Sequence, residues 1–230
     1  MFLRCRSTQA EYFDAPDRSF EQVREDYALL GRVNRLVRFA EPFQRVLPPA
    51  LGEAVCVSLD VLDLGAGDGS LGAALSKWAA GRGWRWRITN LDLNPLALRL
   101  APGTHNVAGS ALSLPFKSGS FDLVIATQMT HHLNTDDDVV RHFREAWRVS
   151  RRVVMIYDLH RNAGLYWALA GMLVAMGVPG HFRSDGLVSV KRGWRVPEWQ
   201  RLSSAAGIKE GRVWLDFGTR IVLLAEKPSV

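Results

Sequence analysis

Apolar residues recur along the middle of the chain in short runs, and segments with helical spacing separate most of them. Five of these runs have the length and composition of buried strands, because few polar side chains interrupt them. Strands of this kind that alternate with helices predict a parallel sheet with helices on both faces. We expect strands at residues 55–64, 86–93, 106–109, 121–127 and 152–157, and helices at 70–80, 95–101 and 136–150.

The pattern differs at the amino terminus. Between residues 19 and 47, apolar side chains such as Tyr27, Leu30 and Val33 recur every three or four positions, which predicts helix. The pair Pro48-Pro49 should end this region, since proline has no backbone N–H to continue a helix. We therefore predict a helical segment or lid over residues 1–50 and a main domain over residues 51–230.

The alternation stops again after residue 160. Residues 164–178 are almost entirely apolar, and an arginine- and glycine-rich stretch follows them. Together they predict an insert at about 161–196, in which an apolar helix is buried against another part of the chain. A further helix is expected at 197–206, where Gly207 ends it.

The last two apolar runs predict how the sheet ends. Residues 212–217 and 219–226 have the character of strands, and the tight link between them at Gly218 is typical of an antiparallel hairpin. The expected fold class is α/β: a Rossmann-like, doubly wound, mostly parallel sheet of seven strands whose last strand is antiparallel.

The bulk composition fits a single well-filled domain with an added or inserted lid. The chain has 230 residues, of which 47% are hydrophobic and 23% are charged, far from the composition of a disordered protein. Its net charge of +6 admits RNA, an anionic lipid or an acidic substrate, but the arginines are spread along the chain rather than clustered. We expect a solvated basic surface and no nucleic-acid partner.

The sequence carries no clear signal for a metal site, a disulfide bond or a membrane span. Cys5 and Cys56 show neither metal-ligand spacing nor a disulfide framework, so no metal site is expected. Residues 1–6 lack the apolar core of a secretory signal, and residues 164–178 fall short of the roughly 20 residues that span a bilayer. We expect a cytoplasmic protein without a membrane span, as a monomer or a homodimer.

A glycine-rich loop follows the first expected strand and opens the first expected helix. Gly65, Gly67 and Gly69 would let the backbone turn sharply and approach a ligand. In open α/β sheets small ligands bind at the carboxyl ends of the strands. Asp92 ends the next strand, near the spacing at which an acidic residue holds ribose hydroxyls. The pattern predicts a nucleoside cofactor at this edge of the sheet.

Two cofactors compete for such a loop, NAD and S-adenosylmethionine. Loops that bind NAD read G-x-G-x-x-G, and here Ser70 stands where the third glycine is expected. Asp63 and Asp68 add carboxylates, which would repel a pyrophosphate but attract a sulfonium and an amino group. The charges therefore favour S-adenosylmethionine.

Four sequence blocks in order resemble the class I S-adenosylmethionine-dependent methyltransferases. Residues 61–69, VLDLGAGDG, resemble the first motif of that family, and NLDLN at 90–94 resembles the second. Residues 109–116 and 120–124 are similar to the region that packs on adenine and leads into the fourth strand. The resemblance covers roughly residues 55–160 and is closest to the small-molecule group similar to quinone-biosynthesis enzymes (methyltransferase types 11 and 25).

The resemblance implies roles for the matching positions. Asp63 orients the loop or the donor's amine, Asp92 accepts from the ribose hydroxyls, and two leucines enclose the adenine. Ala111 stands where many relatives have an acid, so Ser110 or backbone groups would contact the adenine amine. The implied cofactor-binding residues are Asp63, Gly65, Ala66, Gly67, Asp92, Leu93, Ser110, Ala111, Leu112 and Gln128.

Two histidines directly follow the fourth expected strand, so they would lie at the ligand edge of the sheet. The ordinary pKa of histidine suits a general base that activates an oxygen nucleophile. We predict His132 as this base and His131 as the second choice; for each, the alternative is a hydrogen-bonded structural histidine. Asp158, which follows the fifth strand, would orient a histidine or, alternatively, cap the next helix.

The apolar stretch after the fifth strand suggests the acceptor. A lid that contains methionines predicts a small hydrophobic or phenolic acceptor, methylated at oxygen, and the alternative is plain packing against the amino-terminal helices. An RNA methyltransferase is a rival that the basic charge favours, but residues 127–130 lack the Asn/Asp-Pro-Pro-aromatic signature of base amino-methylating enzymes. A binding protein that holds S-adenosylmethionine without catalysis is the second rival. Arg35 is a candidate partner for the donor's carboxylate.

Overall fold

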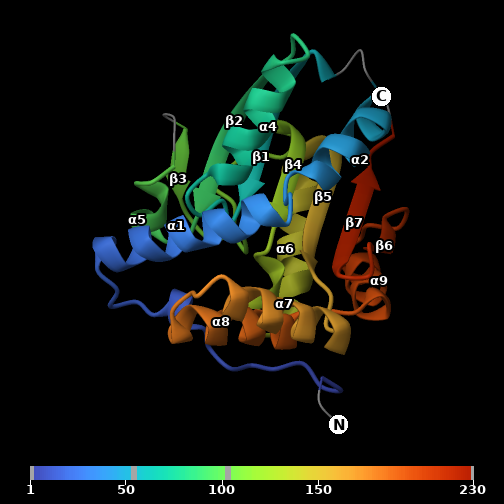
Figure 1. The fold of residues 1–230 in the computed structure, drawn as a ribbon. Coiled ribbons are helices and arrows are strands. Elements are labelled where there is room, and N and C mark those ends of the chain that lie inside the picture. The colour runs from blue at the N-terminus through green and yellow to red at the C-terminus, as the bar shows by residue number, and fades with distance from the viewer. Residues whose placement is uncertain (1–2, 53–55, 102–104, 229–230) are drawn as a thin grey trace.

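The computed structural model describes residues 3–52, 56–101 and 105–228, and its strands form one seven-stranded sheet in the order β3-β2-β1-β4-β5-β7-β6 (Figure 1). The crossovers between its parallel strands place helices on both faces, as the alternating sequence pattern predicts. The first residue of the expected first strand, Val55, lies outside the described residues. The parallel strands are β1 (Ser58–Leu64), β2 (Arg85–Asp92), β3 (Asn106–Ala108), β4 (Phe121–Thr127) and β5 (Ser150–Leu159).

A hairpin completes the sheet. β7 (Arg220–Glu226) runs antiparallel to β5, and β6 (Arg212–Asp216) runs antiparallel to β7. Gly218, with a φ of 70°, lies in the turn between them, a backbone conformation that glycine adopts without steric cost. The predicted fold class, a mostly parallel seven-stranded sheet whose last strand is antiparallel, is confirmed.

Two hydrophobic cores cover the two faces of the sheet, because successive side chains of a strand point to opposite faces. One face packs against α2 (Glu41–Leu51) and α4 (Ser70–Ala80). The other packs against α6 (Asp136–Val149) and α9 (Val196–Ala205). The short α5 (Pro95–Leu98) lies beside β2 and β3.

The amino-terminal helices correct one expectation. Pro48-Pro49 does not break the chain: both prolines lie in the last turns of α2, and the break comes earlier, after α1 (Phe20–Leu36). α2 continues because Phe43, Leu47 and Leu51 form one buried face against the sheet. That burial outweighs the backbone hydrogen bonds that the prolines cannot make.

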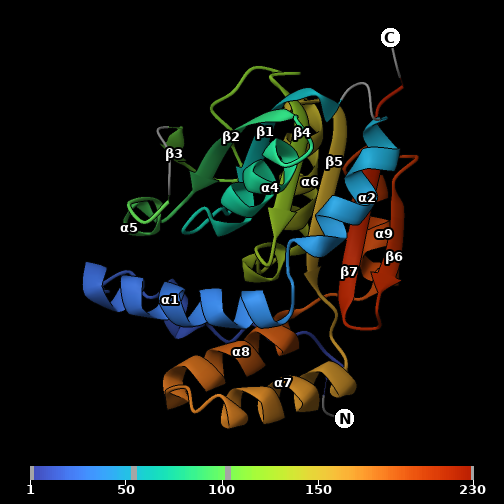
Figure 2. The same ribbon diagram turned by 45° about the horizontal axis from the view of Figure 1, so that its top comes forward.

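The predicted insert contains two helices. α7 (Ala163–Ala175) is the expected apolar helix, but the arginine- and glycine-rich stretch after it is also helical, as α8 (Gly180–Arg192). A Cβ atom at Gly186 would lie 3.0 Å from Leu173, so this glycine lets α8 pack closely on α7. Together with α1, the two helices lie across the carboxyl ends of the parallel strands (Figure 2). The expected domain division near residue 50 stays a prediction.

Even α7, whose thirteen residues are mostly apolar, is too short for a bilayer. Within the described residues, no helix combines the length and hydrophobicity that a membrane span requires.

Candidate active site

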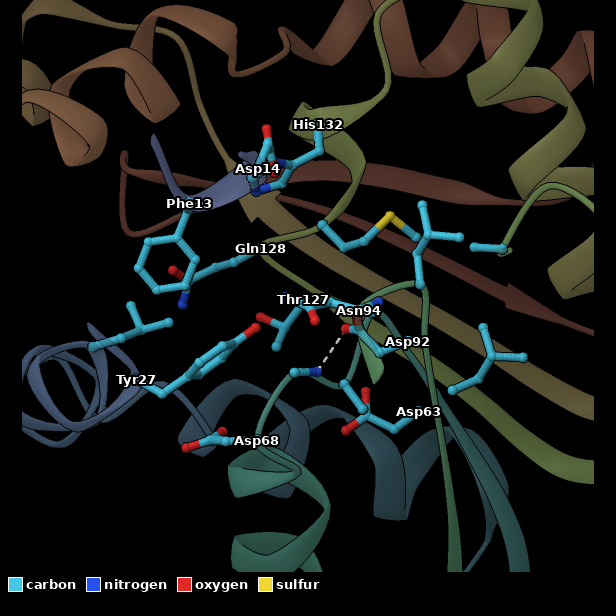
Figure 3. Close-up of a pocket in the computed structure, with 18 of the residues that line it drawn as sticks. Phe13, Asp14, Tyr27, Asp63, Asp68, Asp92, Asn94, Thr127, Gln128 and His132 are labelled. Carbon is cyan, nitrogen blue, oxygen red and sulfur yellow. Dashed lines mark hydrogen bonds and ion pairs between the residues drawn. The ribbon is translucent and has the colours of Figure 1, made fainter. Parts of the chain in front are cut away.

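Two cavities lie at the carboxyl edge of the sheet. The first, of about 660 Å³, lies between the glycine-rich loop, the end of β2 and α1, and we call it the loop chamber (Figure 3). The second, of about 950 Å³, lies among α1, α2, α7, α8 and the ends of β5 and β7, and we call it the lid chamber. Since both adjoin the ends of the central strands, they occupy the place where open α/β sheets bind ligands.

The glycine-rich loop is shaped by what packs against it. Gly65 and Gly67 have positive φ angles of 66° and 56°. A Cβ atom at Gly65 would collide with Met129, and one at Gly67 would lie 2.6 Å from the ring of Tyr27. Tyr27 thus extends from α1 onto the loop (Figure 3). Any other residue would be strained and crowded at either glycine.

Asp63, next to the last residue of β1, is a buried carboxylate. It is 1% exposed, and neither of its oxygens makes a hydrogen bond of good geometry within the described chain, although the N–H of Gly72 offsets part of its charge. Burial, with the nearby charge of Asp92, raises the pKa of Asp63 to about 8. A buried acid without a partner is costly, so a cationic ligand beside it would be bound favourably.

Asp92 ties the second strand to the loop. One of its oxygens accepts the N–H of Gly67 at 2.7 Å, and the other accepts the N–H of Asn94 at 2.8 Å (Figure 3). Burial raises the pKa of Asp92, while these backbone donors partly counteract the rise. Because each carboxylate oxygen has two lone pairs, both can still accept a ligand hydroxyl.

The structure brings the predicted cofactor residues together. All ten line the loop chamber, although they come from four separate segments of the chain. Leu93 is 75% exposed and lies at the rim, while the hydroxyl of Ser110 accepts the N–H of Leu112 at 3.2 Å. Arg35 is exposed and does not line the chamber. The individual roles of these residues stay predictions.

His132 lies in the short helix η2 (Thr130–His132), directly after β4. Its Nδ1 is 2.9 Å from Asp14, whereas its side chain stays 29% exposed and lines both chambers. Burial alone would lower the pKa of His132, but the hydrogen bond to Asp14 and the charge of Glu11 raise it overall. Asp14, which sequence reasoning missed, thus holds this ring.

His131 is held by the other predicted acid. Its Nδ1 lies 2.7 Å from Asp158, which also accepts the backbone N–H of His131 at 2.9 Å. Both side chains are buried, and burial would raise the pKa of Asp158, but the charge and hydrogen bond of His131 lower it instead. The histidine that Asp158 contacts is thus His131, and an orienting role in catalysis stays a prediction. This histidine lines only the lid chamber.

Two arginines clamp η2 and the amino-terminal segment. Arg192 donates to the carbonyl oxygens of His131 and His132, at 3.0 and 2.7 Å, and to that of Gln9. Arg6 donates to the carbonyl oxygen of His131 at 2.6 Å. Arg192 is buried, as are Arg18 and Arg161. Part of the basic charge that we expected at the surface therefore holds the site together.

The two chambers share a wall. Gln128 adopts a left-handed backbone with a φ of 52°, which is uncommon for a residue other than glycine, and its amide donates to the Asn34 side chain at 3.1 Å. Such strain often accompanies a functional position. The residues that line both chambers are Phe13, Leu30, Asn34, Gln128 and His132.

Comparison with known proteins agrees with this geometry. Residues 62–156 match the family described as a methyltransferase domain. A curated relative, the demethylmenaquinone methyltransferase of Roseiflexus castenholzii, is 36% identical over 109 residues. Residues 62–156 form a methyltransferase domain. The aligned region is 45% of this chain and 40% of the relative, so less than half of that protein is matched.

Solved structures share the fold of the methyltransferase domain. A possible histamine N-methyltransferase from Thermotoga maritima aligns over 91% of this chain and 98% of its own, with a TM-score of 0.64 and 16% identity. Magnesium protoporphyrin IX methyltransferase from Synechocystis, with bound SAH, aligns over 84% of each chain with a TM-score of 0.56 and 14% identity. The resemblance drawn from the motifs is confirmed, and the predicted cofactor, S-adenosylmethionine, agrees with this family.

The site also contains one group of potential metal ligands. Within the described part of the chain, Glu11, His131 and His132 offer atoms that lie within 4.8 Å of one another. The guanidinium of Arg192 lies 3.8 Å from Glu11 and 3.3 Å from Asp14. It already supplies positive charge there, which disfavours a second cation.

The site residues that sequence reasoning missed come mainly from the amino-terminal segment before α1. Asp185 of α8 accepts the N–H groups of Tyr12 and Phe13, each at 2.9 Å. This contact directs Phe13 and Asp14 toward the chambers (Figure 3). No motif marked the segment, because its position depends on contacts with residues more than 170 positions away.

Proposed function

We propose that this chain transfers a methyl group from S-adenosylmethionine to an oxygen atom of a small, largely apolar acceptor. The observation that supports this most directly is the wall shared by the two chambers. A donor in the loop chamber and an acceptor in the lid chamber would meet at Gln128 and His132. Two separate chambers with one point of contact suit a reaction between two bound molecules.

The residues of the loop chamber fit the donor. Bound there, S-adenosylmethionine supplies an electrophilic methyl group on a sulfonium. Asp63 and Asp68 provide negative charge for its cationic groups, and Asp92 has lone pairs free for ribose hydroxyls. The glycines at 65 and 67 let Met129 and Tyr27 pack against the loop, and both of these side chains line the chamber.

His132 is the base that we propose for the acceptor hydroxyl. Asp14 fixes the ring through Nδ1, which leaves Nε2 to take a proton. The raised pKa of His132 means that its neutral, proton-accepting form predominates only above the ordinary histidine value. Turnover should therefore rise with pH through a midpoint above about 6.5.

We expect α7 and α8, which we call the lid, to keep water from the shared wall. α7 and α8 line the acceptor side with apolar groups, among them Leu169, Met172 and Phe182. An apolar lining binds an apolar acceptor and keeps water from the reacting groups.

The test is to replace His132 and measure binding and turnover separately. In His132→Gln we expect methyl transfer to a panel of phenols to fall by roughly 10²- to 10⁴-fold, the usual contribution of a general base. The affinity for S-adenosylhomocysteine should stay unchanged in calorimetry, since no step of donor binding needs this proton acceptor. The rising limb of the pH profile should disappear with the histidine.

His160→Gln is the matched control, because His160 lines neither chamber. It should retain both activity and pH profile. Full activity of His132→Gln would remove His132 as the base, and a wild-type chain that methylates no phenol would contradict the proposed acceptor class.

A further inference from the structure

Arginines of the lid chamber differ in whether they have partners. Arg38 pairs with Glu41 at 3.2 Å, and Arg45 pairs with Asp216 at 2.7 Å. The guanidinium of Arg82 lies over the rings of Trp78 and Trp84. Arg220 is the exception: within the described residues its side chain has no hydrogen bond, ion pair or ring contact.

Arg220 is placed by the sheet. It opens β7 opposite Leu159 of β5, and both residues line the lid chamber. Alternation along the strand puts it on the same face as Val222 and Leu224, which pack in the core beneath α2. The side chain is half-buried, and the pKa of the guanidinium is lowered by burial, with the nearby Tyr157 and then Asp158 acting in the opposite direction.

A positively charged guanidinium in this position favours the binding of an anion. Guanidinium stays protonated even when it is partly buried, and a buried charge without a partner is unfavourable. The acids that line the same chamber are engaged elsewhere: Glu11 with Ser189, Asp185 with backbone N–H groups, and Glu41 with Arg38. The chamber itself therefore offers Arg220 no free counter-ion among the described residues.

We propose that Arg220 binds an oxyanion of the acceptor, so that the acceptor is an amphiphile with an apolar body and a carboxylate or phosphate at one end. This inference rests on the proposed function, since it assigns the lid chamber to the acceptor. The planar fork of the guanidinium matches both kinds of oxyanion in two parallel hydrogen bonds. The apolar side chains of α7 and α8 would contact the body of the molecule.

The sheet geometry sets the length of this acceptor. Gln128, at the shared wall, follows β4, and Arg220 belongs to β7, which is two strands away across β5. Two inter-strand spacings amount to about 10 Å. The nucleophilic oxygen and the anionic group should therefore lie at opposite ends of the acceptor.

The experiment uses a hydroxynaphthoate whose hydroxyl and carboxylate lie at opposite ends of the ring system. Its binding to the full chain, saturated with S-adenosylhomocysteine, is measured by calorimetry beside the carboxamide and the phosphonate of the same skeleton. We expect the carboxylate to bind the wild type at least roughly tenfold more tightly than the carboxamide, as a charge-assisted bidentate pair implies. The phosphonate shows which oxyanion the site prefers.

Three variants test whether Arg220 causes the preference for the carboxylate over the carboxamide. Arg220→Gln should abolish the difference between acid and carboxamide, whereas Arg220→Lys should keep part of it, because lysine retains the charge without the fork. Arg212→Gln is the matched control on β6, where Arg212 is exposed and pairs with Glu226. It should leave the preference intact.

The inference is overturned if the wild type binds the acid and the carboxamide equally, or if Arg220→Gln keeps the full preference. Donor binding and methyl transfer to phenols, measured on the same samples, separate this failure from failure of the proposed function. Methylation of phenols without any acid preference contradicts only the role of Arg220. A preference for the acid in a chain that methylates no phenol contradicts the proposed function and leaves the anion site standing.

Discussion

The loop chamber and the lid chamber lie side by side but are built in different ways. The loop chamber takes most of its lining from the consecutive strand–helix units between residues 63 and 133. The lid chamber is assembled from residues 11–45, 78–82, 128–132, 157–189 and 217–220, which meet only in the folded chain. A site made by one local motif can be read from a sequence, whereas a site made by long-range packing cannot.

The two chambers also differ in charge. Carboxylates at the ends of β1 and β2 make the loop chamber acidic. The lid chamber is mainly apolar and ends at Arg220, which has no ion-pair partner in the described part of the chain. The first arrangement suits a cationic donor, and the second suits an apolar acceptor with an anionic end. Experiments that perturb one chamber and leave the other intact would test this division.

Among the variants that separate the two chambers, the largest effect is the loss of stability expected from Phe182→Ala in α8. Phe182 is buried in a small cluster with Val33, Leu173 and Val178, separate from the two cores of the sheet. Removing such a ring costs about 3 kcal/mol. Because the cluster is a satellite, the loss should appear as local opening of the lid. Hydrogen exchange should show amide protection reduced in α7 and α8 and unchanged in β4 and β5.

Phe143→Ala is the matched control for this variant. Phe143 is fully buried in the core between α6 and the sheet. Its loss should reduce protection throughout the molecule. If Phe182→Ala also reduced protection throughout the molecule, α7 and α8 would not form a separate cooperative unit. The two chambers would then not differ in how readily their walls open.

The sequence predicted the elements of the loop chamber better than those of the lid chamber. The helix at 70–80 and the strand at 121–127 match the structure to the residue, because strong apolar runs and glycines bound them. The ten cofactor residues converge for the same reason: they follow the ends of strands whose order the fold class determines. The helix at 180–192 was missed, since its glycines and arginines serve contacts with α7 and η2 that no local pattern reveals.

The two histidines could be predicted only in part. Their place after β4 was predictable, but the partner of each was not. His132 is held by Asp14, which is 118 residues away and belongs to a segment without a motif. Arg220 was overlooked because an arginine at the start of a strand is ordinary, and only the structure shows that none of the described residues pairs with it.

Asp92→Ala should have the next largest effect, on the loop chamber alone. The substitution removes a charged acceptor for the donor and also the hydrogen bonds to Gly67 and Asn94. We expect donor binding to weaken by about 2 kcal/mol, measured by calorimetry with S-adenosylhomocysteine. Asp92→Asn, which keeps one acceptor oxygen, should lose less. Unchanged affinity in Asp92→Ala would count against contact with the ribose.

The smallest effect concerns the pH dependence of donor binding at Asp63. Its pKa of about 8 in the free protein should fall when a cation is bound beside it, so binding releases a proton. The affinity for S-adenosylmethionine should then rise with pH up to about 8, by at most about tenfold per pH unit, and stay level above. Asp63→Asn should give a flat profile.

The raised pKa of Asp63 also predicts how the stability of the free protein depends on pH. Because the folded value lies above the ordinary one near 4, Asp63 favours folding at low pH, and this contribution is lost as pH rises from about 4 toward 8. Asp60→Asn is the control, since Asp60 lies in the same strand and pairs with Arg87. It should keep the pH dependence of both binding and stability. A wild-type affinity that is independent of pH would mean that the buried carboxylate does not face the cationic part of the donor.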